Sequence, residues 1–392
     1  MLGHGKIFVQ LNSANKYCQG RHMKHVIVYR NKERYAGWPA NYGIWNWGDE
    51  IVTGFTLTYH DNQGGFHYRD KDKTTETIQS RSLDGGMTWT NSPAPLIAPG
   101  NIGLASDEHM NLDLGPVANR VNAPKPFNGS IDTTAPDFAL LCSRNALKAG
   151  ASSWFYISKD RCHHWDGPYT LPMFNQLGIA ARTDYLTYGP QNPNKLTLLL
   201  SSTKPDGDQG RVFCAQSTDG GQNFIFKSWL RENPDGLDIM PSSVKLDSGS
   251  IITAVRCRNT IQNHCWIDLI RSDDDGANWH YVSTAVSETG IAGNPPAMLK
   301  LPDNRIALMY GYRSYNSFNS YFNDPQSGIH CVISEDEGET WNRKVTLRED
   351  AGNQDIGYPR AIVRKDGQIV VVYYYNDSTE GERYIAATIW KP

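Results

Sequence analysis

Arginines in this chain gather next to the ends of apolar, β-branched runs. The set is Arg144, Arg182, Arg256, Arg313 and Arg360, with Trp38 and Asn294 at the starts of similar runs. A guanidinium holds a carboxylate through two parallel N–H bonds, so arginines converging on one place favour an anionic ligand. The alternative is that each arginine pairs with a structural Asp or Glu. We expect the set to bind a carboxylate-bearing ligand.

Two kinds of proton chemistry are open to the polar residues near these arginines. Elimination beside a carboxylate needs a His or Tyr that takes the neighbouring proton, and His67, His109 and Tyr358 supply those types. Hydrolysis commonly uses paired carboxylates, one as proton donor and one as base or nucleophile. The aspartates available for it are Asp61, Asp70 and Asp184. We therefore take Tyr358, His67, Asp61 and Asp184 as the catalytic candidates.

A repeated phrase tells which elements must position these residues. RSLDGGMTW (81–89) has near-copies, and the aspartates of the five phrases lie 55 to 76 residues apart. These aspartates are Asp84, Asp160, Asp219, Asp274 and Asp336. Asp and Ser side chains bond the backbone of a turn, and Gly supplies its positive φ, so the phrase itself is predicted to be structural. Such a period indicates a repeated supersecondary unit.

Between the phrases, β-rich runs are joined by Asp, Asn and Gly turns. The stretches are 240–258, 294–313 and 358–375, with the turns LDSGS, LPDNR and RKDGQ. Each unit then contains four antiparallel strands, which predicts an all-β fold, a β-propeller. We expect six blades, with seven left open by the long first interval. The strand 25–29 is expected to complete the last blade and close the ring.

Composition limits the classes of partner. The formal net charge is −3, and there is neither a basic block nor an apolar run of 18 residues, so we expect no nucleic acid and no membrane as partner. Residues 1–22 are expected to be an extension without a signal-peptide pattern, which slightly favours the cytoplasm, with one propeller domain over 23–392.

Seven cysteines show no metal-type spacing, and Cys257 and Cys265 are expected to be free unless the protein is exported. No cofactor is expected, and a structural calcium ion is left open.

The repeated phrase resembles the Asp-box of sialidase-like (BNR-repeat) propellers, and the resemblance covers nearly the whole chain. Those enzymes use three arginines, a Tyr nucleophile paired with Glu, and an Asp acid/base. The resemblance implies Tyr358 as nucleophile, Arg256 as a carboxylate-binding arginine, and Asp61 or Asp70 as acid/base. The chain departs from the pattern at the first arginine (GWPAN, 37–41), at the Glu (Met240-Pro241-Ser242) and at the third arginine, where His330 is nearest. Ordinary sialidase activity is therefore not expected.

Longer motifs resemble a particular branch of these propellers. They are WPANYGIWNWGDEI (38–51), AARTDY (180–185), GNPPA (293–297), GYPRAIV (357–363) and AATIW (386–390). The branch is allied to enzymes that remove terminal rhamnose from glucuronic acid, as hydrolases or lyases, some with a catalytic His. Asn46 stands where that His is placed. The resemblance implies a glycoside hydrolase that removes a terminal sugar from an acidic glycan; a uronate lyase and a non-catalytic lectin are the alternatives.

Overall fold

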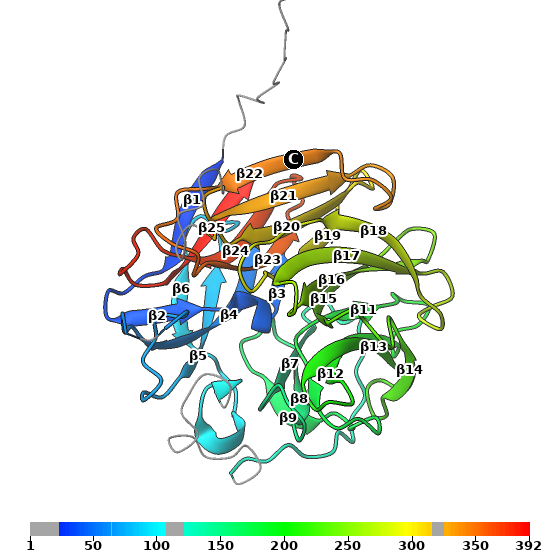
Figure 1. The fold of residues 1–392 in the computed structure, drawn as a ribbon. Coiled ribbons are helices and arrows are strands. Elements are labelled where there is room, and N and C mark those ends of the chain that lie inside the picture. Colours follow the sequence, from blue (N-terminus) through cyan, green and yellow to red (C-terminus); the bar gives the residue numbers. More distant parts are fainter. Residues whose placement is uncertain (1–22, 64, 107–120, 316–324) are drawn as a thin grey trace, which may run out of the picture.

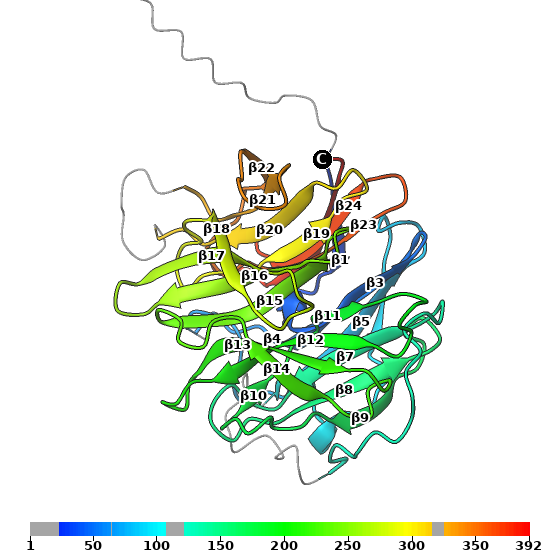
Figure 2. The same cartoon turned by 90° about the vertical axis from the view of Figure 1, so that its right-hand side faces the viewer.

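Six antiparallel sheets surround a common centre in the computed structural model (Figure 1), which describes residues 23–63, 65–106, 121–315 and 325–392. Figure 2 shows the same arrangement turned by 90°. The prediction of an all-β propeller with six blades is confirmed. The expected extension 1–22 and the candidate His109 lie outside the described residues.

The first three blades occupy residues 34–229. Blade 1 contains β2 (Arg34–Gly37), β4 (Glu50–Tyr59), β5 (Glu76–Ser82) and β6 (Thr90–Pro93), with β3 (Ile44–Trp47) also pairing with β4. Blade 2 contains β7 (Ala139–Arg144), β8 (Ser153–Ser158) and β9 (Asp166–Thr170). Blade 3 contains β10 (Ile179–Ala180) and β11 (Tyr185–Thr187), both paired with β12 (Leu196–Thr203), then β13 (Gln209–Ser217) and β14 (Ile225–Trp229). Within the described ranges, blade 2 therefore has three strands rather than the expected four.

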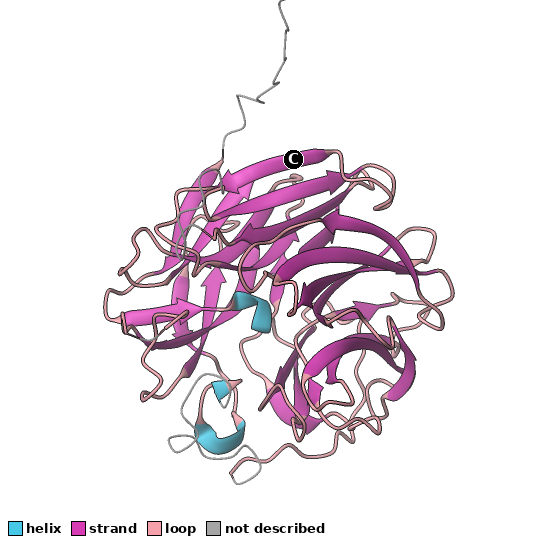
Figure 3. Cartoon of the chain, viewed as in Figure 1, coloured by secondary structure: helices cyan, strands magenta, loops and turns pink. Residues whose placement is uncertain are grey.

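The other three blades each have four strands. Blade 4 contains β15 (Leu237–Lys245), β16 (Ile251–Asn259), β17 (His264–Ser272) and β18 (His280–Val286). Blade 5 contains β19 (Ala297–Lys300), β20 (Ile306–Tyr312), β21 (Gly328–Ser334) and β22 (Arg343–Arg348). Blade 6 contains β23 (Gly357–Val363), β24 (Ile369–Tyr375), β25 (Tyr384–Trp390) and β1 (Lys24–Tyr29). Two short 3-10 helices complete the described elements, η1 (Pro39–Asn41) and η2 (Pro99–Asn101), and η1 lies at the centre of the ring (Figure 3).

The ring closes through β1, as the sequence predicted. β1 pairs antiparallel with β25, and His25 Nδ1 lies 3.0 Å from Thr388 Oγ1 across this pair. Val28 is buried between blade 6 and blade 1, in a cluster with Phe55 and Ile389. The outer edge of β25 would otherwise be open, and it is thus covered by β1, a strand from the opposite end of the propeller sequence.

Each blade buries both faces against its neighbours, which explains the continuous apolar runs of the inner strands. In β24, Tyr373 and Tyr375 pack in the cluster shared with blade 5, whereas Tyr374 packs in the cluster shared with blade 1. Alternation at period two turns successive side chains toward opposite neighbours.

The five Asp phrases occupy the turns between the last two strands of the first five blades, away from the ring's centre. Asp84 Oδ1 accepts the N–H groups of Met87 (3.0 Å) and Thr88 (2.9 Å), and Ser82 Oγ accepts the N–H of Gly86 (2.8 Å). The Trp of the last phrase, Trp341, donates to Ser283 Oγ of blade 4 at 3.0 Å. The phrase therefore fixes a turn and joins blades.

The six cysteines in the described part of the chain are free thiols, including Cys257 and Cys265 on the adjacent strands β16 and β17. Over those same residues, no group of three or more His, Cys, Asp or Glu side chains is arranged to hold a metal ion. Nor does any helix found there have the length and apolar character to cross a membrane.

Candidate active site

A cavity of about 260 Å³ opens at the end of the ring where inner strands begin and second strands end. Its described lining comes from five of the six blades. The residues are Trp38, Asn41, His67, Arg69, Arg144, Leu147, Arg182, Gln209, Leu237, Ile239, Arg256, Arg258 and Tyr358. Five are arginines, and none of these lining residues is Asp or Glu.

Asn41 connects two of the arginines. At the end of η1, its Oδ1 accepts Arg144 Nη2 and Arg182 Nε, each at 3.2 Å. The two guanidiniums come from blades 2 and 3, and the amide between them carries no charge. Their positive charges are therefore positioned without being neutralised by Asn41.

Tyr358 reaches the cavity through a distortion at the start of β23. The β23–β24 register shifts between Gly357 and Arg360, and Tyr358 adopts a left-handed φ of 51°. Buried Asn294 holds this conformation, since its Oδ1 accepts the N–H of Tyr358 at 2.8 Å. A non-glycine residue in this region is uncommon, and bulges of this kind re-aim a side chain.

Positive charges surround the hydroxyl of Tyr358. Arg256 Nη1 donates to Tyr358 Oη at 3.1 Å, and the guanidinium of Arg313 lies 5.5 Å from the centre of the Tyr358 ring. Burial alone would raise the pKa of Tyr358, but the charges of Arg256, Arg313 and Arg182 outweigh it and lower the pKa. The hydroxyl of Tyr358 therefore loses its proton more readily than that of an ordinary tyrosine.

His67 enters the cavity from the loop after β4 and is held from behind. Its Nδ1 lies 2.7 Å from Oδ1 of Asp355, whose side chain is fully buried. The same Asp355 oxygen accepts Tyr374 Oη at 2.8 Å, and Asp355 Oδ2 accepts Arg383 Nε at 2.9 Å. With Nδ1 committed to Asp355, Nε2 is the nitrogen available to a ligand.

The charge state of this pair follows from its surroundings. Burial would raise the pKa of Asp355, but His67 and Arg383 outweigh it and lower the pKa, so the carboxylate is ionised. Burial lowers the pKa of His67, and Arg313 and Arg69 act in the same direction, against Asp355. At neutral pH, His67 is therefore a neutral imidazole that can accept a proton.

The sequence matches the BNR repeat-like domain over residues 104–371. The chain belongs to the BNR repeat-like family. No curated protein matches the sequence.

Solved structures similar to this BNR repeat-like chain share its fold at low sequence identity. A protein of unknown function from Dyadobacter fermentans has a TM-score of 0.69 and 20% identity, covering 94% of this chain and 99% of that one. The NanB sialidase of Streptococcus pneumoniae has a TM-score of 0.60 and 14% identity, covering 93% and 70%. An α-L-arabinanase of Penicillium chrysogenum has a TM-score of 0.56 and 13% identity, covering 94% and 98%. The sialidase-like propeller fold expected from the sequence is thus confirmed.

Among the residues selected from sequence, six line this cavity of the BNR repeat-like chain. They are Tyr358, His67, Arg144, Arg182, Arg256 and Trp38. Arg313 and Asn294 lie directly behind Tyr358 instead, where Arg313 donates to Tyr374 Oη (2.7 Å) and Asn294 supports the backbone of Tyr358. Asp61 lies in the loop after β4, where its Oδ1 accepts the N–H of Gln63, and it is absent from the lining.

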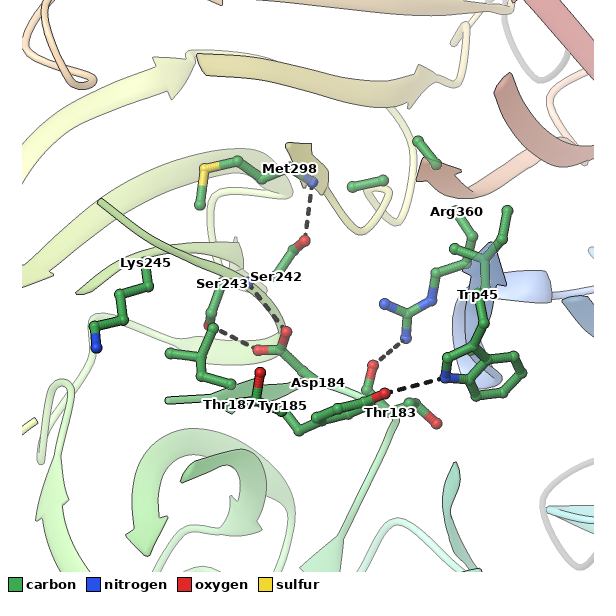
Figure 4. Close-up of a pocket in the computed structure, with 15 residues that line it drawn as sticks. Trp45, Thr183, Asp184, Tyr185, Thr187, Ser242, Ser243, Lys245, Met298 and Arg360 are labelled. Atoms are coloured by element: carbon green, nitrogen blue, oxygen red, sulfur yellow. Dashed lines mark hydrogen bonds between the residues drawn. The ribbon is translucent and has the colours of Figure 1, made fainter. Parts of the chain in front are cut away.

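Asp184 and Arg360 line a second cavity of about 420 Å³ (Figure 4). Asp184 accepts Ser243 Oγ at 2.7 Å and Ser243 N–H at 3.1 Å, and burial raises its pKa. Arg360 Nη2 donates to the carbonyls of Thr183 (2.7 Å) and Ala40 (2.9 Å). Because Thr183 and Ala40 are neighbours of Arg182 and Asn41 in the chain, Arg360 supports the active-site cavity from the other side.

Sequence reasoning missed three residues of the site. Arg69 lies two residues after His67 in HYRD, so it shares the loop that was selected, and Gln209 begins β13. Asp355 lies three residues before Tyr358, and an acidic residue beside a candidate tyrosine is a signal that could have been followed. Its partner His67 is 288 residues away in the chain, so the pair itself had no local signature.

Proposed function

We propose that this protein is a glycoside hydrolase that removes a terminal sugar from an acidic, carboxylate-bearing glycan. The observation that carries the proposal is the meeting of Tyr358, His67 and Arg256 in one cavity that is rich in arginine. A guanidinium can bind a ligand carboxylate through two parallel N–H bonds. The fold relatives with hydrolase names are consistent with this proposal.

In hydrolysis, the phenolate oxygen of Tyr358 attacks the anomeric carbon while the glycosidic C–O bond breaks. This route uses the imidazolium form of His67, which gives its Nε2 proton to the departing oxygen. Water then attacks the anomeric carbon, releases the sugar and the Tyr358 phenolate, and returns a proton to His67. Cationic stabilisation of the phenolate takes the place of the missing Glu partner, because the charges of Arg256 and Arg313 lower the pKa of Tyr358. Asp355 keeps the imidazole oriented in both steps.

A uronate lyase is the second candidate, and the neutral state of His67 favours it. His67 Nε2 would take the C5 proton, the C4–O bond would break to give a C4=C5 double bond, and Tyr358 would donate a proton to the departing oxygen. Arginine stabilises the charge that develops on the carboxylate. This route uses no catalytic carboxylate, and none lines the described cavity.

The test is product analysis on a glycan with terminal rhamnose on glucuronate, the first candidate by resemblance of the 38–51 and 357–363 motifs. Free rhamnose with a saturated uronate identifies a hydrolase. An unsaturated uronate, seen by its ultraviolet absorbance, identifies a lyase. Tight binding without product identifies a lectin, and neither binding nor product from any uronate glycan refutes the proposal.

A further inference from the structure

The geometry points to a second anion subsite at Arg258, so that the ligand carries two anionic groups on successive sugar residues. This inference rests on the proposed function and narrows its substrate class. The first group, a carboxylate, lies at Arg256 beside Tyr358. The second is a uronate carboxylate or a sulfate ester at Arg258, nearer the mouth of the cavity.

Arg256 is buried and Arg258 is half-buried, so Arg258 lies nearer to solvent. Arg256 and Arg258 are two residues apart on β16, so they share one face of the strand and their backbones are about 7 Å apart. β16 ends at Asn259, where the chain turns into β17 at the cavity end of the blade. Both arginines line the cavity. Their separation suits groups on adjacent residues of a glycan rather than one carboxylate.

The guanidinium of Arg256 donates hydrogen bonds to protein groups, whereas the guanidinium of Arg258 donates none to any described residue. Arg256 donates to Tyr358 Oη and to the carbonyl of Ala292. Over the residues that the structure describes, no hydrogen bond or ion pair joins the guanidinium of Arg258 to another residue, and its Nε is buried without a partner. The buried Nε–H of Arg258 is unfavourable without an acceptor, which a ligand or an ordered water must supply.

Nearby carboxylates are engaged elsewhere. Both carboxylate oxygens of Asp235 accept the side-chain amide of Asn259 at 3.3 Å. Glu288 Oε1 accepts the N–H of Gly290 at 2.6 Å. Among the described residues, neither carboxylate forms a hydrogen bond or an ion pair with Arg258.

Gln209 supplies a second sign of a ligand at this end of the cavity. It begins β13 in the neighbouring blade and lines the same cavity, and its Oε1 is buried without a hydrogen-bond partner. An unsatisfied amide oxygen can accept a sugar hydroxyl. Arg258 and Gln209 together offer donors for an anion and an acceptor for a hydroxyl, which is the donor and acceptor set of an acidic sugar.

The experiment compares ligands that differ only at the second sugar residue. Calorimetry would give the Kd of a diuronate, of the matching disaccharide with a neutral second residue, and of the same disaccharide with a sulfate on that residue. The variant is Arg258→Gln. The control is Arg305→Gln, which removes the same charge at an arginine that pairs with Asp303 in the turn after β19.

In the wild type, the diuronate or the sulfated disaccharide should bind about ten- to a hundredfold more tightly than the neutral one, and the tighter of the two identifies the anion. Arg258→Gln should abolish this difference while changing the Kd of the neutral disaccharide less than about twofold, and Arg305→Gln should preserve the difference. Equal weakening of all three ligands by Arg258→Gln would place Arg258 in the first subsite and overturn the inference, as would equal wild-type affinities. If no uronate ligand binds the wild type, the proposed function fails together with the inference.

Discussion

Arg256 contacts Tyr358 and also lines the site of the proposed carboxylate. We predict that Arg256→Lys lowers kcat/KM for a carboxylate substrate about ten- to a hundredfold, because an ammonium group cannot form two parallel N–H bonds to the carboxylate. The measurement compares this substrate with one whose carboxyl group has been reduced to an alcohol. A loss of equal size on both substrates would mean that Arg256 acts only as a support between blades.

His67 is the residue whose removal should affect chemistry more than binding. His67→Gln should lower kcat about 10²- to 10⁴-fold with little change in thermal stability. Asp61→Asn is the matched control, because Asp61 lies in the same loop but outside the cavity lining, and it should retain nearly full activity. A large loss in Asp61→Asn would instead support its sequence-based assignment as a catalytic aspartate.

The pH dependence of kcat/KM should reveal which way His67 moves its proton. Burial lowers the pKa of His67, so its titration should lie below that of an ordinary histidine. A general base loses activity as the pH falls through this pKa, because the imidazole becomes protonated. A general acid loses activity as the pH rises through it. The pH-dependent loss of kcat/KM on that side of the profile should be absent in His67→Gln. If this loss persisted in the variant, a group other than His67 would cause it.

For single residues, the sequence identified side chains that line the cavity better than it identified the residues that support them from outside the lining. Tyr358, Arg182 and Arg256 were recognisable because each lies near a strand end. Asp184 is only two residues beyond Arg182, yet it lines the other cavity, because the inner strands of blade 3 are split between β10 and β11. No local sequence pattern indicates that the inner strand of blade 3 is divided into β10 and β11.

The bulge at the start of β23 is the element that aims Tyr358. Gly357 has a φ of 110°, and a Cβ there would lie 2.1 Å from Asn294 Oδ1. Gly357→Ala should therefore lower the free energy of unfolding by roughly 1–3 kcal/mol and lower kcat at least tenfold, since Tyr358 must move.

Gly249→Ala is the matched control for this bulge. Gly249 has a φ of 93°, but a Cβ there meets nothing within 4 Å. It should lose stability through strain alone and retain kcat. If Gly357→Ala also retained kcat, the precise position of Tyr358 would not matter for turnover.

The Asp phrases are turn elements, so their loss should reduce stability and leave turnover unchanged. Asp84 is exposed, but its carboxylate accepts three hydrogen bonds from Met87 and Thr88. Asp84→Ala should lower the free energy of unfolding by about 1 kcal/mol, the scale of a lost local cap. Chemical denaturation measures this value, and a marked fall in kcat of the folded variant would give the phrase a catalytic role.

For the whole molecule, closure of the ring should depend on the buried face of β1. Val28 is 3% exposed and adjacent Ile27 is 55% exposed. Val28→Asp should destabilise by about 3–5 kcal/mol, because it buries an unpaired charge between blades, whereas Ile27→Asp should have little effect. Thermal unfolding with light scattering measures both, and equal stability of the two variants would contradict closure through this face.

The six-bladed ring could be predicted because the Asp phrases are local and recur once in each of the first five blades, with one further strand-rich unit after them. Ser82 and Asp84 form their turn within a few residues, so the pattern is readable without any long-range contact. The three-stranded second blade could not be read in this way. Strand number there depends on pairing between segments that the phrase at Asp160 does not reach.

The pairing of β1 with β25 has a consequence for biosynthesis. His25 and Thr388 are 363 residues apart in the chain, so β1 leaves the ribosome long before its partner exists. During translation, the first strand and the growing edge of the last blade both remain unpaired, a state prone to association with other nascent chains. Blades 1 to 5 can assemble as they emerge, but the final step is a slow, non-local docking. Chaperones that shield strand edges should therefore affect the yield of this protein more than its final stability.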